Sequence, residues 1–262
     1  MSTSRLGHGR AAPIAAPFAV LMAVLLAPAL SACSASPGSS SGSSPASTDA
    51  APTASTTRGV SVILSPAQVA GGAEVLIIGD SYTEGYGITP GTDWAHLVVA
   101  DRGWDATIDG ISGTGFTQGA AADGRTGIDY ASRLRSHADD DSSYDLVVLQ
   151  GGLNDLFVPA AEQRDNVAAA VRAAHAAWPE AGVVVFGPIA PFGGFGDRDD
   201  AGIIRTAAGE AGALYIDPVS PSLWLDEANS PEFDLGDGLH VNEAGQEHLA
   251  ERFVEALLDA VE

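Results

Sequence analysis

With 262 residues, 45% of them hydrophobic, the chain is long enough to bury a substantial core. Its 34 acidic residues against 12 basic ones give a formal net charge of −22 at pH 7, and every basic residue is an arginine. Because so acidic a surface repels other polyanions, we expect no nucleic-acid partner and no membrane binding through basic residues.

Residues 1–32 have the layout of an export signal. Two arginines precede an apolar run at 17–30, and small residues follow it up to Cys33, the only cysteine. The letters LSAC at 30–33 resemble the bacterial lipobox, which implies cleavage before a lipid-bearing cysteine. An uncleaved anchor or an ordinary signal peptide is the alternative, although this run is short against the roughly 20 residues of a membrane span. We therefore expect Cys33 to anchor the mature protein at the outer face of the cell membrane, with secretion as the alternative.

Residues 33–60 predict a flexible tether. They are nearly all Ser, Ala, Thr, Pro and Gly, a composition that cannot bury enough apolar surface to become ordered. A flexible chain of this length typically reaches about 25–30 Å. The remaining residues, 61–262, form the expected folded domain. With Cys33 assigned to the lipid, no cysteine is left in it for a disulfide.

The folded part alternates short apolar runs with longer amphipathic ones. The apolar runs predict strands at 75–79, 104–110 (the weakest signal), 145–151, 182–187 and 213–217. The amphipathic runs predict helices near 93–101, 127–138, 160–177, 199–211 and 243–261, the last with Asn242 as its N-cap. This alternation predicts an α/β fold: a three-layer α/β/α sandwich with a mainly parallel, five-stranded sheet.

Three polar stretches follow predicted strands or precede the last helix. They are GDS at 79–81, GLND at 152–155 and DGLH at 237–240. Ligands of open parallel sheets collect beyond the carboxyl ends of the strands, so we expect these stretches to meet at one edge. A serine hydroxyl becomes a good nucleophile when a histidine takes its proton and a third group orients that histidine. Ser81, His240 and Asp237 provide these groups, and the Asn154 amide with nearby backbone N–H groups provides oxyanion donors.

Each stretch alone has a plain structural explanation, such as a strand-ending turn or a helix cap. Their occurrence together, in this order, favours catalysis. The other histidines of the domain lack partners at metal-ligand spacing, so we expect no metal site.

With these motifs, the sequence resembles the SGNH (GDSL-type) hydrolases. GDSYTEG, the glycine of ISGTGF, GLND and DGLH match the four sequence blocks of that family in order, over about residues 73–262. The resemblance implies a flavodoxin-like sandwich, ester hydrolysis, and no metal or cofactor. By position it assigns the nucleophile to Ser81, the base to His240 and its orienting partner to Asp237. The oxyanion donors would be Ser81, Gly113 and Asn154, with Gly115 as the alternative glycine.

Tyr82 stands where the usual GDSL motif has leucine, and we expect the change to be tolerated because that side chain packs rather than reacts.

Two long connections, at 187–200 and 218–238, are rich in Gly, Pro and aromatic residues. Phe192, Phe195 and Trp224 in them either line an acyl or sugar site or fill the small core of the loops. We expect an esterase for short acyl or acetyl groups, acting on a small ester or an acetylated glycan. The alternatives are an acyltransferase to a glycan acceptor and a non-catalytic, glycan-binding envelope lipoprotein. The sequence does not predict the oligomeric state.

Overall fold

The structure is a computed structural model that describes residues 64–119, 127–140, 142–189, 192, 194 and 199–261. The expected signal at 1–32, Cys33 and the tether at 33–60 lie outside the described residues. No helix in the described part of the chain is long and apolar enough to cross a membrane.

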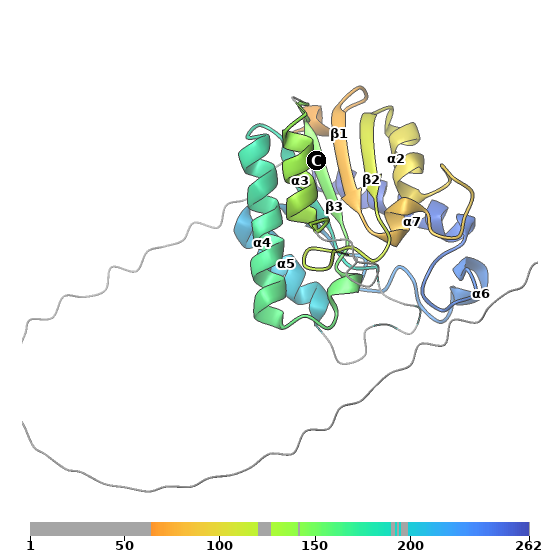
Figure 1. The fold of residues 1–262 in the computed structure, drawn as a ribbon. Helices are drawn as coiled ribbons and strands as arrows, with labels where there is room; N and C mark the ends of the chain where they lie inside the picture. The colour runs from red at the N-terminus through yellow and green to blue at the C-terminus, as the bar shows by residue number, and fades with distance from the viewer. Residues whose placement is uncertain are drawn as a thin grey trace, which may run out of the picture. The chain divides into compact units, whose positions relative to one another are not determined.

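A five-stranded parallel sheet forms the centre of the domain (Figure 1). All five predicted strands are confirmed: β1 (Glu74–Gly79), β2 (Asp105–Gly110), β3 (Leu146–Gln150), β4 (Gly182–Phe186) and β5 (Leu214–Ile216). They lie in the order β2-β1-β3-β4-β5, and every neighbouring pair is parallel. This is the flavodoxin-like strand order, in which the chain reverses direction across the sheet between β1 and β3.

The inner strands are buried on both faces, which explains their continuous apolar runs. In β3, Leu146 and Val148 belong to the hydrophobic cluster on one face, whereas Val147 and Leu149 belong to the cluster on the other. Since side chains alternate along a strand, one uninterrupted apolar run supplies both halves of the core.

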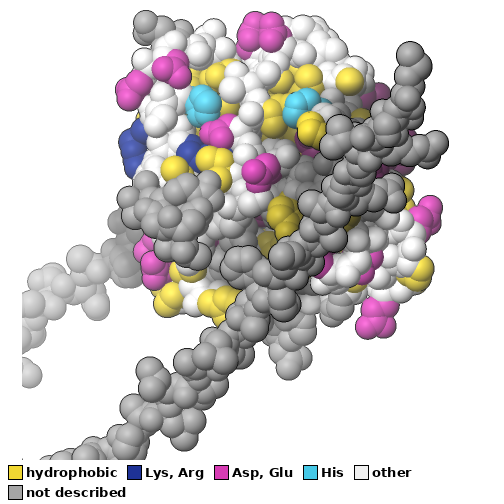
Figure 2. Space-filling model, turned by 45° about the vertical axis from the view of Figure 1, so that its right-hand side comes forward, with side chains coloured by type: hydrophobic (Ala, Val, Ile, Leu, Met, Phe, Trp, Pro, Cys, Tyr) yellow, Lys and Arg dark blue, Asp and Glu magenta, His cyan; other side chains and the backbone are white. Residues whose placement is uncertain are grey.

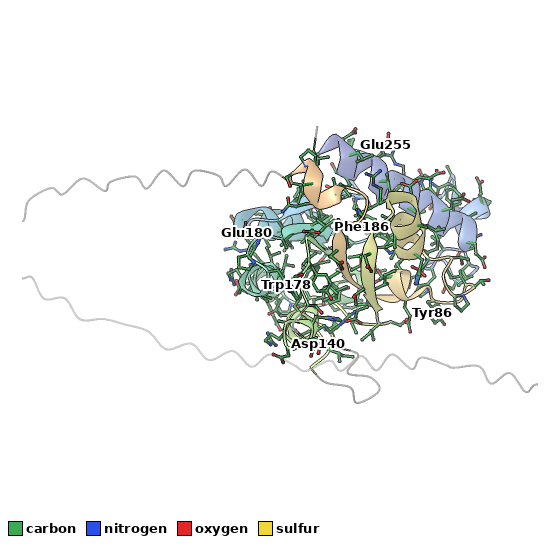
Figure 3. The ribbon with its side chains drawn as sticks, turned by 90° about the horizontal axis from the view of Figure 1, so that it is seen from above. Tyr86, Asp140, Trp178, Glu180, Phe186 and Glu255 are labelled. Carbon is green, nitrogen blue, oxygen red and sulfur yellow. The ribbon has the colours of Figure 1, made fainter. Side chains whose placement is uncertain are left out.

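Helices cover both faces and complete the predicted three-layer sandwich (Figure 1). On one side, α2 (Trp94–Arg102) and α7 (Glu243–Asp259) pack with the first cluster. On the other side, α3 (Tyr130–Ala138), α4 (Ala160–Ala177) and α5 (Asp200–Ala211) pack with the second. Figure 3, seen from above, has Glu255 of α7 and Asp140 after α3 on opposite sides of Phe186 in β4. Asn242 caps α7 as predicted, because its side chain accepts a hydrogen bond from the Gly245 N–H.

Four short helical segments were not predicted. They are η1 (Pro66–Val69), α1 (Ser81–Glu84), η3 (Leu153–Asp155) and α6 (Ser230–Phe233). Segments of three or four residues are too short to show helical periodicity in a sequence. Two of them, α1 and η3, lie at the carboxyl ends of β1 and β3 and carry the predicted site residues Ser81 and Asn154.

The acidic composition is visible on the face drawn in Figure 2, where Asp and Glu side chains are spread over the surface and basic side chains are seen only at the left; histidine side chains lie beside hydrophobic ones.

Candidate active site

Ser81 is the first residue of the short helix α1, directly after β1. Asp80 is the N-cap, and its Oδ1 accepts a hydrogen bond of 3.0 Å from the Tyr82 N–H. The helix ends at Gly85, whose φ of +77° lies in the left-handed region that glycine adopts without strain. Ser81 therefore stands at the carboxyl edge of the sheet on a helix that starts with it.

Gly79 lets this helix fold back closely on the end of β1. A Cβ atom at Gly79 would lie 2.0 Å from Oγ1 of Thr83, a contact that no side chain tolerates. Glycine is therefore needed here because the strand end and the next helix pack closely together.

Side chains from three other elements hold α1 in place. Thr83 Oγ1 donates to Gln150 Oε1 of β3 at 2.7 Å, and the Trp94 indole N–H of α2 donates to Thr83 Oγ1 at 3.1 Å. Gln246 Nε2 of α7 donates to the Tyr82 carbonyl at 3.3 Å. A single helical turn is unstable in isolation, so these buried contacts fix the position of Ser81.

Ser81, His240 and Asp237 form a continuous hydrogen-bond relay. His240 Nε2 lies 3.0 Å from Ser81 Oγ, and His240 Nδ1 lies 2.7 Å from Asp237 Oδ2. Ser81 is buried, with 8% of its surface exposed. A carboxylate at Nδ1 holds the proton there and leaves a lone pair on Nε2 facing the serine hydroxyl. The structure thus brings these three predicted residues together, while their catalytic roles stay predictions.

A tight turn presents the histidine to the serine. The other oxygen of the Asp237 carboxylate, Oδ1, accepts hydrogen bonds from the N–H groups of Leu239 (2.9 Å) and His240 (2.7 Å). Partial burial opposes the charge of this carboxylate, but the hydrogen bonds from His240 and Leu239 outweigh it and lower the pKa of Asp237. Asp237 therefore remains ionised in mildly acidic solution, as an orienting group must.

Two tyrosines, one turn apart, flank the histidine. The buried Tyr82 ring lies 5.8 Å from the His240 ring, and the Tyr82 hydroxyl donates to the carbonyl of Leu239, the residue before the histidine. Tyr86 is half exposed, and its ring lies 4.5 Å from the His240 ring (Tyr86 is labelled in Figure 3). The expectation that Tyr82 only packs was incomplete, since its hydroxyl ties the serine helix to the histidine loop.

The predicted oxyanion donors come from two neighbouring loops. Asn154 lies on η3 after β3, and its Nδ2 donates one hydrogen bond to the Thr114 carbonyl at 2.8 Å. A side-chain amide carries two N–H bonds, so a second one is left for a ligand. The N–H groups of Ser81 and Gly113 have no acceptor among the described residues.

The structure separates the two candidate glycines. The Gly115 N–H donates to the Gln118 carbonyl at 2.7 Å, and a Cβ at Gly115 would lie 2.5 Å from the Asp155 carboxylate. Gly113 has a φ of +74°, and a Cβ there would meet nothing within 4 Å. Gly115 is thus a packing position with an occupied N–H, and these contacts favour Gly113 as the donor.

The buried Asp80, beside the serine, was not singled out by the sequence. It has no exposed surface, and its Oδ2 has no hydrogen-bond partner among the described residues. Burial raises the pKa of Asp80 to about 7, against the opposing effect of the Tyr82 N–H. Its position between a buried strand and the start of a helix could have pointed to it. The interpretation of GDS as a simple turn left this position unexamined.

Replacing Asp80 by asparagine should stabilise the protein more at pH 8 than at pH 5. An unfolded chain releases this proton near the ordinary pKa of 3.8, whereas the folded protein keeps it up to about pH 7. The folded state therefore binds more protons between those values, so Asp80 lowers the free energy of unfolding as the pH rises through them. The asparagine side chain does not ionise and still accepts the hydrogen bond from the Tyr82 N–H.

The measurement is the melting temperature of wild type and Asp80→Asn, by circular dichroism at both pH values. Asp105→Asn, at an exposed aspartate of β2, is the control. An equal difference between wild type and Asp80→Asn at the two pH values would contradict the expectation.

The remaining described histidines have structural partners. Each of the four forms a hydrogen bond with a carbonyl or a carboxylate away from the relay. The pairs are His96 with Asp93, His137 with Asp109, His175 with the Gly212 carbonyl, and His248 with the Trp224 carbonyl. Among the described residues, no three His, Cys, Asp or Glu side chains are grouped so that they could hold a metal ion.

The predicted pocket residues are only partly described. Phe192 and Trp224 are 5% and 7% exposed and belong to the hydrophobic cluster under α2 and α7. The Trp224 ring lies 5.5 Å from that of Phe186. Their burial favours packing over lining, although they pack in the main hydrophobic cluster and not in a small core of the loops; a lining role stays a prediction. Phe195 lies outside the described residues.

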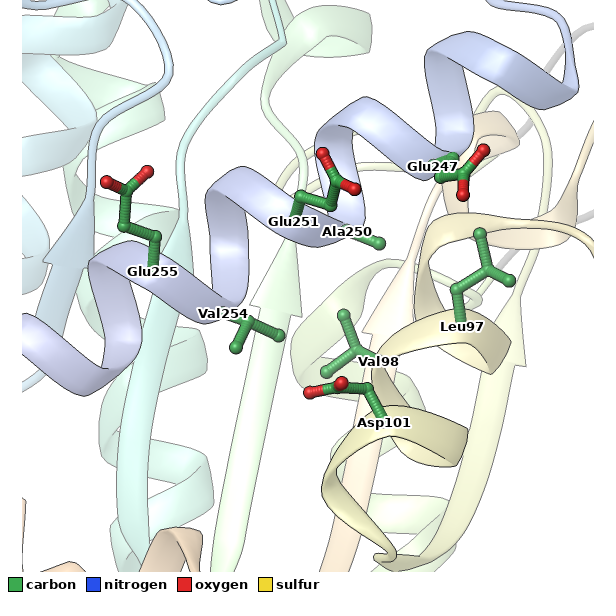
Figure 4. A pocket seen from close by; sticks show the side chains of 8 residues that line it. All are labelled: Leu97, Val98, Asp101, Glu247, Ala250, Glu251, Val254 and Glu255. Atoms are coloured by element: carbon green, nitrogen blue, oxygen red, sulfur yellow. The ribbon is translucent and has the colours of Figure 1, made fainter.

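A groove of about 450 Å³ between α2 and α7 is a separate feature (Figure 4). Its lining combines apolar and acidic side chains, none of which belongs to the relay: Leu97, Val98, Asp101, Glu247, Ala250, Glu251, Val254 and Glu255.

The fold is shared with solved esterase structures. The psychrotrophic esterase EstA from Pseudoalteromonas sp. is 19% identical, with a TM-score of 0.55, over 71% of this chain and 97% of that one. A carbohydrate esterase family 2 enzyme with a carbohydrate-binding domain, from Corynascus thermopiles, is 20% identical, with a TM-score of 0.53, over 72% of this chain and 67% of that one. Identities this low establish the fold alone, and they agree with the predicted α/β sandwich.

Sequence similarity defines the family. Residues 77–248 match the model of the GDSL-like lipase/acylhydrolase family, a stretch that contains Ser81, Asn154 and His240. The chain is also 30% identical over 200 residues to a GDSL lipase of Mycobacterium tuberculosis, covering 68% of this chain and 78% of the relative. The protein belongs to the GDSL-like lipase/acylhydrolase family, which confirms the resemblance inferred from the four sequence blocks.

Proposed function

We propose that the protein is a serine esterase that hydrolyses carboxylic esters through an acyl-enzyme on Ser81. The observation that carries the proposal is the relay from Ser81 Oγ through both nitrogens of His240 to Asp237, at 3.0 and 2.7 Å. Membership of a lipase/acylhydrolase family supports the same chemistry.

In the first half of the reaction, His240 Nε2 takes the Ser81 proton while Oγ attacks the ester carbonyl carbon. The N–H groups of Ser81, Gly113 and Asn154 stabilise the negative oxygen of the tetrahedral intermediate. When that intermediate collapses, the bond to the alcohol breaks and His240 returns the proton to the leaving oxygen. An acyl group then remains on Ser81.

In the second half, a water molecule replaces the alcohol. His240 Nε2 takes one proton from the water as its oxygen attacks the acyl carbon. Collapse of the second intermediate releases the carboxylic acid and returns the proton to Ser81 Oγ. The ionised Asp237 stabilises the imidazolium in both halves. The cycle consumes one water and one ester and needs no cofactor.

We propose short acyl or acetyl esters, on a small alcohol or a glycan, as substrates. The likeness to a carbohydrate esterase supports this choice. The test compares initial rates on p-nitrophenyl acetate, butyrate and palmitate and on an acetylated glycan, with Ser81→Ala protein as the blank. Fastest turnover of palmitate would contradict the short-acyl proposal. Transfer of acetate to an added glycan, in place of its release into water, would instead indicate an acyltransferase.

We further propose that the mature protein is held at the outer face of the cell membrane by a lipid on Cys33. Support comes from the LSAC letters at the end of an export signal. Cys33→Ala should move the protein from the membrane fraction to the soluble exported fraction, because a lipid-free chain with so acidic a surface has no affinity for anionic lipid. The measurement is an immunoblot of both fractions, and unchanged membrane recovery would indicate the alternative, an uncleaved apolar anchor in place of a lipid on Cys33.

A further inference from the structure

A buried arginine, Arg133, lies where two segments of the candidate site meet. It projects from α3 and is 5% exposed. Its Nη1 donates at 3.0 Å to the Gly79 carbonyl and at 3.0 Å to Thr114 Oγ1. Gly79 is the last residue of β1, two residues before Ser81, and Thr114 follows Gly113. One guanidinium group therefore contacts both the strand end that leads to the nucleophile and the loop that carries an oxyanion donor.

Asp109, near the end of β2, fixes the orientation of this guanidinium group. Arg133 Nε donates to Asp109 Oδ2 at 3.0 Å, and Nη2 lies 2.9 Å from Asp109 Oδ1, so the contact is two-pronged. Partial burial opposes ionisation of Asp109, but hydrogen bonds from His137 and Arg133 lower its pKa to about 2. The pair therefore stays charged, and the planar guanidinium directs Nη1 toward Thr114.

Thr114 passes this constraint on to the asparagine. The residue has no exposed surface, and its Oγ1 also donates to the Ile111 carbonyl at 2.7 Å. Its own carbonyl accepts the 2.8 Å hydrogen bond from Asn154 Nδ2. The side chain of Thr114 is thus held by Arg133, and its backbone holds the amide of Asn154.

We propose that Arg133, acting through Thr114, is a positioning residue that sets the orientation of the Asn154 amide, the oxyanion donor that the Thr114 carbonyl binds. The inference rests on the proposed esterase function. Arg133 touches neither the substrate nor the relay in this scheme. Its effect on the rate passes through Thr114, so disturbing Thr114 should slow turnover only while Asn154 is present.

The test is a double-mutant cycle on p-nitrophenyl acetate that combines Thr114→Val with Asn154→Ala. Valine keeps the shape of threonine but accepts no hydrogen bond from Arg133. Thr114→Val alone should lower kcat about 10–100-fold with little change in KM, the loss typical of a small misplacement of a catalytic group. Asn154→Ala alone should lower kcat about 10²–10³-fold. In the Asn154→Ala background, Thr114→Val should cost only about twofold.

Two variants separate positioning from general destabilisation. Thr114→Ser keeps the oxygen that accepts from Arg133 and should restore most of the activity. Thr117→Val is the matched control, because Thr117 lies in the same loop but bonds through Oγ1 to Asn166 instead. Thr114 is the better target than Arg133 itself, since removing the arginine would leave the half-buried Asp109 carboxylate without its cation and threaten the fold.

Additive losses in the cycle, or an inactive Thr114→Ser protein that melts like wild type, would overturn the inference alone. An Asn154→Ala protein as active as wild type would remove the oxyanion scheme and the inference with it. The proposed esterase function fails if the wild-type protein hydrolyses no ester, and that outcome is visible before any variant is made.

Discussion

Ser81→Ala should abolish ester hydrolysis and leave the fold intact. Loss of a serine nucleophile in a comparable relay lowers kcat by about a million-fold, so the activity should fall to background. Ser81 Oγ makes one hydrogen bond in the described structure, to His240, and the helix that carries it is held by Thr83, Gln150 and Trp94. The melting temperature should therefore change by only a few degrees.

A fluorophosphonate probe provides a second readout on the same protein. Wild type should be labelled on the peptide that contains Ser81, because the probe reports an activated serine, and Ser81→Ala should not be labelled. Ser136→Ala, at an exposed serine of α3, is the control and should be labelled like wild type. Activity that survives Ser81→Ala would remove the mechanism, and a wild-type protein without label or activity would favour the non-catalytic alternative.

Asp237→Asn should lower kcat by about 10⁴-fold, the loss typical of a triad whose orienting aspartate becomes asparagine. The introduced asparagine can keep its Oδ1 on the N–H groups of Leu239 and His240. Its NH₂ group then takes the place of Oδ2 and donates to His240 Nδ1. This forces the imidazole proton onto Nε2, which faces Ser81, and leaves no lone pair there to accept the serine proton.

The same loop offers a matched control for this prediction. Asp234 accepts hydrogen bonds from the N–H groups of Gly236 and Gly238 and has no contact with His240 among the described side-chain interactions. Asp234→Asn should keep activity within about threefold of wild type, as most substitutions outside a relay do. If Asp237→Asn retained more than a tenth of the wild-type kcat, Asp237 would not be the orienting group, since tautomer control would then be unimportant.

The sequence predicted the sheet well because inner parallel strands are buried on both faces and therefore appear as continuous apolar runs. The runs at 75–79 and 182–187 are apolar on both faces and agree with β1 and β4 within a residue. The signal for β2 was weak because β2 is an edge strand whose residues are exposed or half-buried. The short helix α1 was not predicted because its four residues form only by contacts with distant elements, which no local pattern contains.

The meeting of Ser81 and His240 was predictable because both stand in polar stretches expected at the carboxyl edge of a parallel sheet. The site was not predictable where the role depends on three-dimensional contacts. Gly113 and Gly115 look alike in SGTG, and only the occupied N–H of Gly115 separates them. Arg133 is one arginine on an amphipathic helix, and nothing in the neighbouring sequence indicates that its guanidinium group contacts the ends of β1 and β2.

Tyr82 has a mechanical consequence beyond its hydrogen bond. Its backbone belongs to the serine helix, and its hydroxyl holds the carbonyl of Leu239, 157 residues further along the chain. A swing of the surface loop that carries His240 must therefore pull α1 with it or break this bond. Leucine at this position, as in the usual GDSL motif, has no hydroxyl and cannot form this bond between α1 and the loop that carries His240. This bond therefore couples the position of the nucleophile Ser81 to that of its base, His240, besides the direct contact between the two side chains.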